Sequence, residues 1–248
     1  HASEPNPAPS ARARRVQPQR NRAMTNPTAA VLAVLAAVLG ATPVAAQTKS
    51  EAPFSLNPFN SAAAVQPAKL SAPQKEAVTG INKYFNGIRT MSGDLVQFGP
   101  DGQRTEGQFH LAKPGKIRFQ YSKPSTLEVV SDATDVIVKD RKNQTQDLYP
   151  LSKTPLRFLL ADQMDLTSEA NVTKVSVEPD LVSIVLEQST VFGDGKLTMV
   201  FDRKTSELKQ WTVTDAQGYD TSVAIYNTTA NQPVDDKLFR IDRTRILQ

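Results

Sequence analysis

The stretch GQFHLAKPGKIRFQY, residues 107–121, holds two short runs in which large apolar residues alternate with polar ones. Such alternation is typical of half-buried strands, and the Lys-Pro-Gly-Lys break at residues 113–116 indicates a tight turn. The apolar residues all stand at odd positions: Phe109, Leu111, Ile117, Phe119 and Tyr121. The stretch therefore predicts a hairpin with one apolar face and one polar face.

The same period of two continues along the chain, interrupted by turn sequences such as GPDG, DRKN and FGDG. It predicts strands near residues 91–98, 104–112, 116–122, 126–131, 135–140, 144–149, 171–178, 181–188, 195–202, 207–214 and 220–226. So many hairpin-linked strands favour one strongly curved sheet. The predicted fold class is mainly β with a helical lid (α+β): an unclosed antiparallel half-barrel of about eleven strands covered by short helices.

Two helical segments interrupt the strand pattern. The first is expected to begin after Ser71, which forms a capping box with Gln74, and to end at Gly87. Its apolar residues follow helical spacing: Val78, Ile81, Phe85 and Ile88. The second is expected to have Thr154 as its N-cap and Pro155 at its first position, with Leu156, Leu159 and Leu160 on one side. These are the only predicted elements that could cover the apolar face of the sheet.

The N-terminal part of the chain has the composition of an export signal. Ala29 to Leu39 is an unbroken apolar run, shorter than the roughly 18 residues that span a bilayer. Small residues follow it, which is typical of a secretory signal peptide and predicts cleavage after Ala46. Met24 is a candidate start. An earlier start, a twin-arginine signal and an organelle transit peptide are the alternatives.

Cleavage at that point divides the chain into three parts. We expect an upstream segment with a signal peptide over residues 1–46, a flexible leader rich in Ala, Pro and Ser over 47–70, and one folded domain over 71–248. Five of the 29 basic residues and one of the 25 acidic residues precede Gln47, which leaves 24 of each. This balance gives no case for a nucleic-acid partner. The chain has no cysteine, so we expect a periplasmic protein without a lipid anchor.

No motif in the sequence indicates catalysis, a metal or a cofactor. His110 lies between two apolar residues and is expected on the polar face, and the chain has no cysteine to serve as a nucleophile. Acidic residues fall in pairs at turns, where aspartate serves backbone hydrogen bonds: Asp132 with Asp135, Asp215 with Asp220, and Asp235 with Asp236. GDGK at Gly193 lacks the spacing of a phosphate-binding loop. We therefore expect no enzyme, no metal site and no cofactor.

The apolar face is the candidate site, as a cavity that its side chains do not fill. The residues predicted to form its wall are Leu95, Phe109, Leu111, Ile117, Phe119, Tyr121, Val129, Ile184, Leu186, Met199, Phe201, Trp211 and Val213. The residues predicted to cover it as a lid are Ile81, Phe85, Leu156, Leu159 and Leu160. Plain packing of a β-sheet core would account for many of the same residues.

The order of these parts resembles the LolA family of periplasmic carriers of outer-membrane lipoproteins. The resemblance runs from about Pro73 to Phe239 and is carried by MSGDLVQF, GQFHLAKPGKIRFQY and LYPLSKTPLRFLL. It implies a LolA-like lipoprotein carrier domain, monomeric and without a cofactor, whose apolar cavity takes the acyl chains of a lipoprotein. It also implies an inner-membrane ABC transporter that delivers the lipoprotein and an outer-membrane acceptor that receives it.

One residue departs from the family pattern. The resemblance implies an arginine before the hairpin proline that latches the lid to the barrel, and this chain has Lys113 there. Lysine lacks the planar donor fork of arginine, so a looser or differently built latch is expected. Two other functions fit the same residues: a periplasmic lipid-binding or envelope-stress sensor module on this fold, and, less favoured, a hydrolase that uses turn carboxylates.

Overall fold

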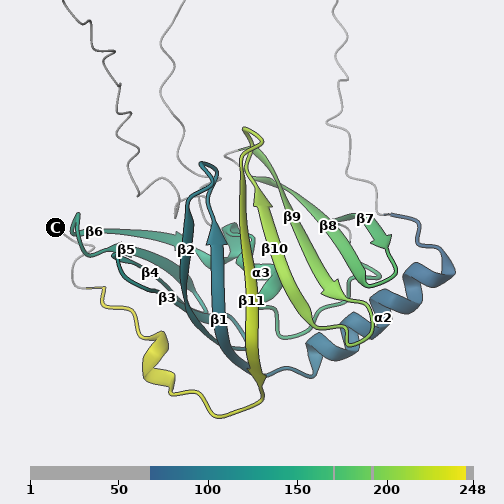
Figure 1. The fold of residues 1–248 in the computed structure, drawn as a ribbon, viewed down its shortest axis with the longest axis horizontal. Helices are drawn as coiled ribbons and strands as arrows, with labels where there is room; N and C mark the ends of the chain where they lie inside the picture. The colour runs from purple at the N-terminus through teal and green to yellow at the C-terminus, as the bar shows by residue number, and fades with distance from the viewer. Residues whose placement is uncertain (1–67, 170, 191–192, 244–248) are drawn as a thin grey trace, which may run out of the picture.

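The computed structural model describes residues 68–169, 171–190 and 193–243, and in this part of the chain eleven antiparallel strands form one sheet (Figure 1). The sheet order is β6-β5-β4-β3-β2-β1-β11-β10-β9-β8-β7, so β6 and β7 are its two edges and the barrel is unclosed. The strands are β1 (Thr90–Phe98), β2 (Arg104–Ala112), β3 (Lys116–Tyr121), β4 (Leu127–Asp132), β5 (Asp135–Asp140), β6 (Thr145–Pro150), β7 (Val172–Val177), β8 (Leu181–Thr190), β9 (Gly193–Asp202), β10 (Leu208–Thr214) and β11 (Asp220–Ala230). The predicted fold class is confirmed.

Strand β11 runs four residues beyond its predicted end. Asn227, the first residue after the predicted strand, adopts a left-handed backbone with φ of 50°. The pairing of β11 with β1 nevertheless continues, because the register shifts between Ser92 and Asp94 at a β-bulge. A bulge absorbs one extra residue and bends the sheet, so the strand passes through the asparagine. Sequence alternation alone does not reveal such a bulge.

The sheet is strongly curved, so strands that are distant in its order face each other across its inner side. Neighbouring strands lie about 4.8 Å apart, so β3 and β10, four places apart, would be about 19 Å apart in a flat sheet. Instead the rings of Phe119 on β3 and Trp211 on β10 have their centroids 6.2 Å apart. The inner side of the sheet is therefore a narrow apolar trough.

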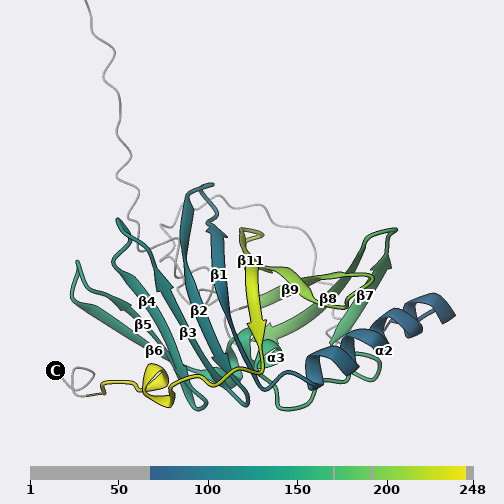
Figure 2. The same cartoon turned by 60° about the horizontal axis from the view of Figure 1, so that its bottom comes forward.

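Helix α2 (Ala72–Asn86) lies across one end of the trough (Figure 2). Its predicted capping box is present in the bond from Ser71 N to Gln74 Oε1, 2.8 Å, and it ends at Gly87 as predicted. Val78, Ile81 and Phe85 are its buried residues, which confirms the predicted stripe. Phe85 packs edge-on against Phe201 of β9.

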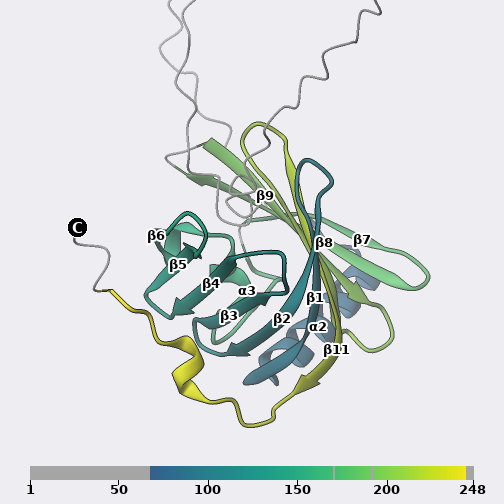
Figure 3. The same ribbon diagram turned by 60° about the vertical axis from the view of Figure 1, so that its left-hand side comes forward.

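The second predicted helix is a 3₁₀ turn, η1 (Leu151–Lys153), followed by the short helix α3 (Leu156–Leu159). The prediction that Thr154 caps this helix with Pro155 at its first position is wrong by one residue, because Pro155 precedes the helix. The Thr154 hydroxyl donates to Leu151 O at 2.9 Å and so closes the 3₁₀ turn. Figure 3 shows α3 in the space that the curved sheet encloses. The three lid leucines of this segment are buried, as the pattern predicts.

The chain after β11 crosses the outer side of the sheet and packs on β3 and β4 through the 3₁₀ turn η2 (Asp236–Phe239) (Figure 2). Phe239 is buried there, while Leu238 and Ile241 are half-buried. Two salt bridges from Arg243, to Asp132 at 2.7 Å and to Asp135 at 2.8 Å, tie this segment to the sheet. The outer side of β3 to β5 is therefore covered as well as the inner side.

The predicted signal peptide and most of the predicted leader, residues 1–67, lie outside the described residues, so those boundaries stay predictions. Over the described part of the chain, the helices are too short and too polar for any of them to cross a membrane.

Candidate functional site

All residues predicted for the cavity wall project from the inner side of the sheet into one apolar cluster. Each is buried except Tyr121, which is half-buried. The polar residues between them point outward, and Arg118 illustrates this: it forms a salt bridge with Glu128 and donates to Leu238 O at 2.8 Å on the outer side. The structure thus confirms which face the residues occupy. Their role in binding a ligand stays a prediction.

An apolar cavity of about 20 Å³ lies at the α2 end of the trough. Its lining comprises Phe85, Ile88, Met91, Phe109, Leu111, Lys113, Ile117, Leu159, Leu208, Trp211 and Ile225. Sites that take small molecules are usually about 300–1,000 Å³, so this cavity holds no acyl chain as it stands. An acyl chain that entered here would have to displace side chains of α2 and α3.

The lining overlaps only in part with the predicted wall. Phe109, Leu111, Ile117 and Trp211 border this cavity, whereas the remaining predicted wall residues pack in the cluster without bordering it. Four residues border it and were not predicted as wall or lid residues: Ile88, Met91, Leu208 and Ile225. Met91 could have been found, because it faces Leu111 directly across the pair β1–β2 and therefore shares its side of the sheet.

The lid is held together as a unit by two asparagines on one side of α2. Asn86 forms a reciprocal pair with the backbone of Met164, accepting from its N–H at 2.7 Å and donating to its carbonyl at 2.9 Å. Asn82, one turn earlier, accepts from Leu166 N at 3.0 Å. Arg89 adds an exposed salt bridge to Asp162 at 2.6 Å. Helix α2 and the segment after α3 are thereby connected.

Lys113 joins this lid to the hairpin between β2 and β3. Its ammonium donates to Phe85 O at 2.8 Å and lies 3.7 Å from the centroid of the Phe85 ring, a cation–π contact. Burial, with a further contribution from Arg89, lowers the pKa of Lys113 to about 8, although Asp162 acts in the opposite direction. Gly115 N also donates to Leu160 O at 2.9 Å. Both lid elements thus contact the hairpin turn.

Polar groups lie on the inner side of the sheet from Trp211, which borders the apolar cavity, toward the other end of the trough. The Tyr121 hydroxyl donates to Gln97 Oε1 at 2.7 Å, and burial raises the pKa of Tyr121. Trp211 Nε1 and Thr221 Oγ1 are buried and have no hydrogen-bond partner among the described residues. Buried polar atoms without partners destabilise a fold, so each needs an explanation.

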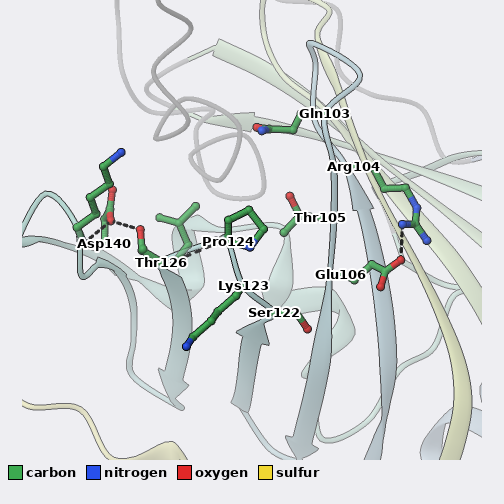
Figure 4. A pocket seen from close by; sticks show the side chains of 12 residues that line it. Gln103, Arg104, Thr105, Glu106, Ser122, Lys123, Pro124, Thr126 and Asp140 are labelled. Atoms are coloured by element: carbon green, nitrogen blue, oxygen red, sulfur yellow. Dashed lines mark hydrogen bonds and ion pairs between the residues drawn. The ribbon is translucent and has the colours of Figure 1, made fainter.

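A polar pocket of about 470 Å³ lies beyond this end, where β2 to β5 begin or end (Figure 4). It is lined by Gln103, Arg104, Thr105, Glu106, Ser122, Lys123, Pro124, Ser125, Thr126, Leu127, Asp140 and Lys142. Its carboxylates are already engaged: Asp140 accepts from Thr126 Oγ1 at 2.6 Å, and Glu106 pairs with Arg104. The apolar cavity and this polar pocket therefore lie toward opposite ends of the hairpin β2–β3, and we call the pocket end the polar rim.

The residues considered for catalysis have structural roles. His110 Nδ1 lies 2.9 Å from Ser92 Oγ on the polar side, and burial, together with Arg118, lowers the pKa of its imidazole. Asp132 accepts from two turn N–H groups and Arg243; burial by itself would raise the pKa of Asp132, but these hydrogen bonds lower it. Asp235 caps η2. Among the described residues, no three His, Asp or Glu side chains are grouped closely enough to hold a metal ion.

Asp215 and Asp220 also serve the turn between β10 and β11. Asp215 accepts from Gln217 N and Tyr219 N, and Asp220 accepts from the Thr214 hydroxyl at 2.6 Å. Their partners are those that aspartates in turns ordinarily have.

Comparison with known sequences places the same region in one family. Residues 86–242, more than half of the chain, match the profile of the family described as outer membrane lipoprotein carrier protein LolA. An outer-membrane lipoprotein carrier protein of Chromobacterium violaceum is 27% identical over 191 residues, which cover 71% of this chain and 88% of the relative. One from Pseudomonas aeruginosa is 22% identical over 196 residues, covering 74% and 92%.

Solved structures resemble the chain more distantly. A LolA superfamily protein from Nitrosomonas europaea aligns with a TM-score of 0.36 and 10% identity, over 66% of this chain and 98% of that one. The MucA/MucB complex of Pseudomonas aeruginosa aligns with a TM-score of 0.42 and 11% identity, over 67% and 60%.

Proposed function

The chain belongs to the LolA family of outer membrane lipoprotein carrier proteins, and from this premise we propose that it binds the acyl chains of lipoproteins in its apolar trough. The observation that carries the proposal is the trough itself: the inner side of an unclosed sheet is lined by large apolar side chains and covered by two helical segments. A soluble acyl carrier needs such a surface, because each buried CH₂ contributes about 0.8 kcal/mol.

The free energy of burying each CH₂ group also explains why a carrier needs an incompletely closed sheet. One acyl chain of ordinary length would contribute on the order of 10 kcal/mol, and three would approach the ceiling of noncovalent affinity. Release into water would then be very slow. A carrier of this kind passes its lipoprotein directly to an acceptor, which an unclosed barrel with short covering helices permits.

We propose the partners that the family relationship implies. An inner-membrane lipoprotein-releasing ABC transporter loads the carrier, and an outer-membrane lipoprotein acceptor unloads it. The protein acts in the periplasm after removal of residues 1–46, as a monomer and without enzymatic activity. The predicted signal peptide and the relatives' description as outer-membrane lipoprotein carriers support this assignment.

A binding experiment with one matched pair of variants tests the function. The full chain is mixed with a detergent-solubilised triacylated lipoprotein, the detergent is removed, and the soluble complex is measured by size-exclusion chromatography. Phe119→Glu places a carboxylate on the inner side, where Phe119 is 1% exposed, and is expected to abolish the complex. Phe98→Glu is the control, because Phe98 is 43% exposed on the outer side and its variant should bind like the wild type.

A buried charge also threatens folding. Leu159→Gln, on the lid, is therefore included as a second variant that leaves the sheet unchanged, and circular dichroism checks each variant. Loss of binding by folded Leu159→Gln supports the proposal. Equal binding by all folded variants contradicts it. No complex even with the wild type, together with normal lipoprotein sorting in cells depleted of the protein, favours the sensor module instead.

A further inference from the structure

Two buried hydrogen-bond donors on the inner side of the sheet lack acceptors. Trp211 is 3% exposed and Thr221 is 1% exposed, and neither Trp211 Nε1 nor Thr221 Oγ1 has a partner among the described residues. An indole N–H can only donate, and a threonine hydroxyl can donate in any direction that its rotation allows. A ligand that carries acceptor oxygens would satisfy both groups.

The strand register places the two donors next to each other. Trp211 on β10 pairs with Val223 on β11, and Val213 pairs with Thr221, so Trp211 and Thr221 are diagonal neighbours on the same face. Diagonal neighbours lie about 7–8 Å apart. Val223 pairs in turn with Gln97 on β1, which brings the hydrogen-bonded Gln97–Tyr121 pair into the same region.

This polar region stands between two different surroundings. On one side Trp211 borders the apolar cavity under α2. On the other side Tyr121 is followed by Ser122, which lines the polar rim pocket together with Thr105 (Figure 4). An amphiphile in the trough would therefore lie with its hydrocarbon under the lid and its polar end toward the rim, so its acyl carbonyls would fall near the unpaired donors.

We propose that Trp211 Nε1–H and the Thr221 hydroxyl donate hydrogen bonds to the ester carbonyl oxygens of a diacylglyceryl ligand. This rests on the proposed function and goes beyond it, because it assigns recognition of the ester group and a direction of binding to named residues. Hydrocarbon alone would leave both donors unpaired. A diacylglyceryl group carries two ester linkages on neighbouring carbons, and each provides one carbonyl acceptor, so the two acceptors match two neighbouring donors.

The test compares three ligands with the same chain length on the full chain: a synthetic diacylglyceryl-cysteine lipopeptide, its dialkyl-ether analogue without carbonyls, and phosphatidylglycerol. Each donor is expected to contribute about threefold to tenfold in affinity. The wild type should bind the ester lipopeptide at least about tenfold more tightly than the ether. Thr221→Val keeps the shape of the side chain and Trp211→Phe keeps an aromatic ring, while both remove the donor. Both variants should lose affinity for the ester relative to the ether. Thr229→Val, at an exposed position of the same strand, is the control.

A second measurement observes the donor directly. Trp211 is the only tryptophan of the chain, so a ¹⁵N–¹H spectrum contains one indole resonance. The ester ligand should move its proton downfield, as a new hydrogen bond does, and the ether analogue should not.

The outcomes separate the two proposals. If ester and ether bind equally, with equal indole shifts, the ester site is wrong while the carrier function stands. If neither lipopeptide binds, the carrier function itself fails. If phosphatidylglycerol binds as tightly as the lipopeptide and with the same donor dependence, the donors do recognise esters, but those of membrane lipids, and assignment to lipoprotein is overturned.

Discussion

At the scale of single residues, Lys113 distinguishes this chain from the pattern that the family resemblance implies. Its contact with Phe85 O joins the lid to the hairpin, as expected of a latch. Its ammonium is disfavoured by burial and by Arg89, so its pKa is lowered to about 8. An arginine would stay charged throughout the physiological range. The latch in this chain is therefore a titratable one.

This difference predicts a pH-dependent stability. The pKa of Lys113 is about 8 in the folded protein, against 10.5 for an ordinary lysine. Between these values the unfolded chain holds a proton that the folded chain has lost, so the free energy of unfolding rises as the pH rises from about 8 to about 10.5. That contribution is lost as the pH falls to 8. Urea unfolding at several pH values measures it.

Lys113→Met and Lys113→Arg are the matched variants, because neither side chain titrates in this window. Tyrosines and other lysines titrate equally in all three proteins. Between pH 8 and 10.5, the free energy of unfolding should therefore rise more steeply with pH in the wild type than in either variant. Equal slopes would mean that Lys113 is not desolvated in the closed lid.

Sequence alone could identify Lys113 as a candidate, since it stands at a recognisable turn. It could not provide the shifted pKa, which depends on burial in the folded chain and on two charged groups distant in sequence, Arg89 and Asp162. Nor could it find the unpaired indole of Trp211, because an absent partner is visible only in three dimensions.

At the scale of elements, strand and helix positions could be predicted almost entirely from the sequence. Alternation reports which face is buried, and capping residues such as Ser71 mark a helix start. The differences have two causes. A tertiary feature, the bulge in the β1–β11 pairing, extends β11 past Asn227, and a local hydrogen bond of the Thr154 hydroxyl closes the η1 turn where the pattern predicts a helix cap. The hydrogen bonds from the asparagines of α2 to residues 164–166 could not be predicted, because asparagines on a helix ordinarily face solvent.

Those hydrogen bonds predict the behaviour of the lid. Asn86→Ala removes both hydrogen bonds to Met164, so the backbone N–H and carbonyl of Met164 lose these partners in a partly buried place. The loss should lower the free energy of unfolding by about 1–3 kcal/mol. Amides of α2 should exchange faster with solvent, because the helix loses its attachment. Thr79→Ala, at an exposed position of α2, is the control and should leave both measurements nearly unchanged. Unchanged exchange in Asn86→Ala would show that α2 is held by its apolar side alone.

At the scale of the whole molecule, the curvature of the sheet creates the apolar trough. A flat sheet would present Phe119 and Trp211 as separate surface residues, but bending brings them together across one trough. The alternation of residues predicts an apolar face, and the number of strands predicts a curved sheet. Neither predicts how strongly the sheet curves. How far the apolar side chains fill the trough follows from packing, and the pattern of residues does not specify it.

The most direct test of the central claim is contact between acyl chains and Trp211, the only tryptophan. A lipoprotein with brominated acyl chains is bound to the full chain, and tryptophan fluorescence is compared with that of the unbrominated complex, using a lipoprotein that itself lacks tryptophan. Bromine quenches indole only near contact. If the acyl chains lie in the trough, bromination quenches Trp211 fluorescence strongly in the wild type and in Phe98→Glu. A stable complex whose Trp211 fluorescence is unaffected by bromination would contradict this placement of the acyl chains.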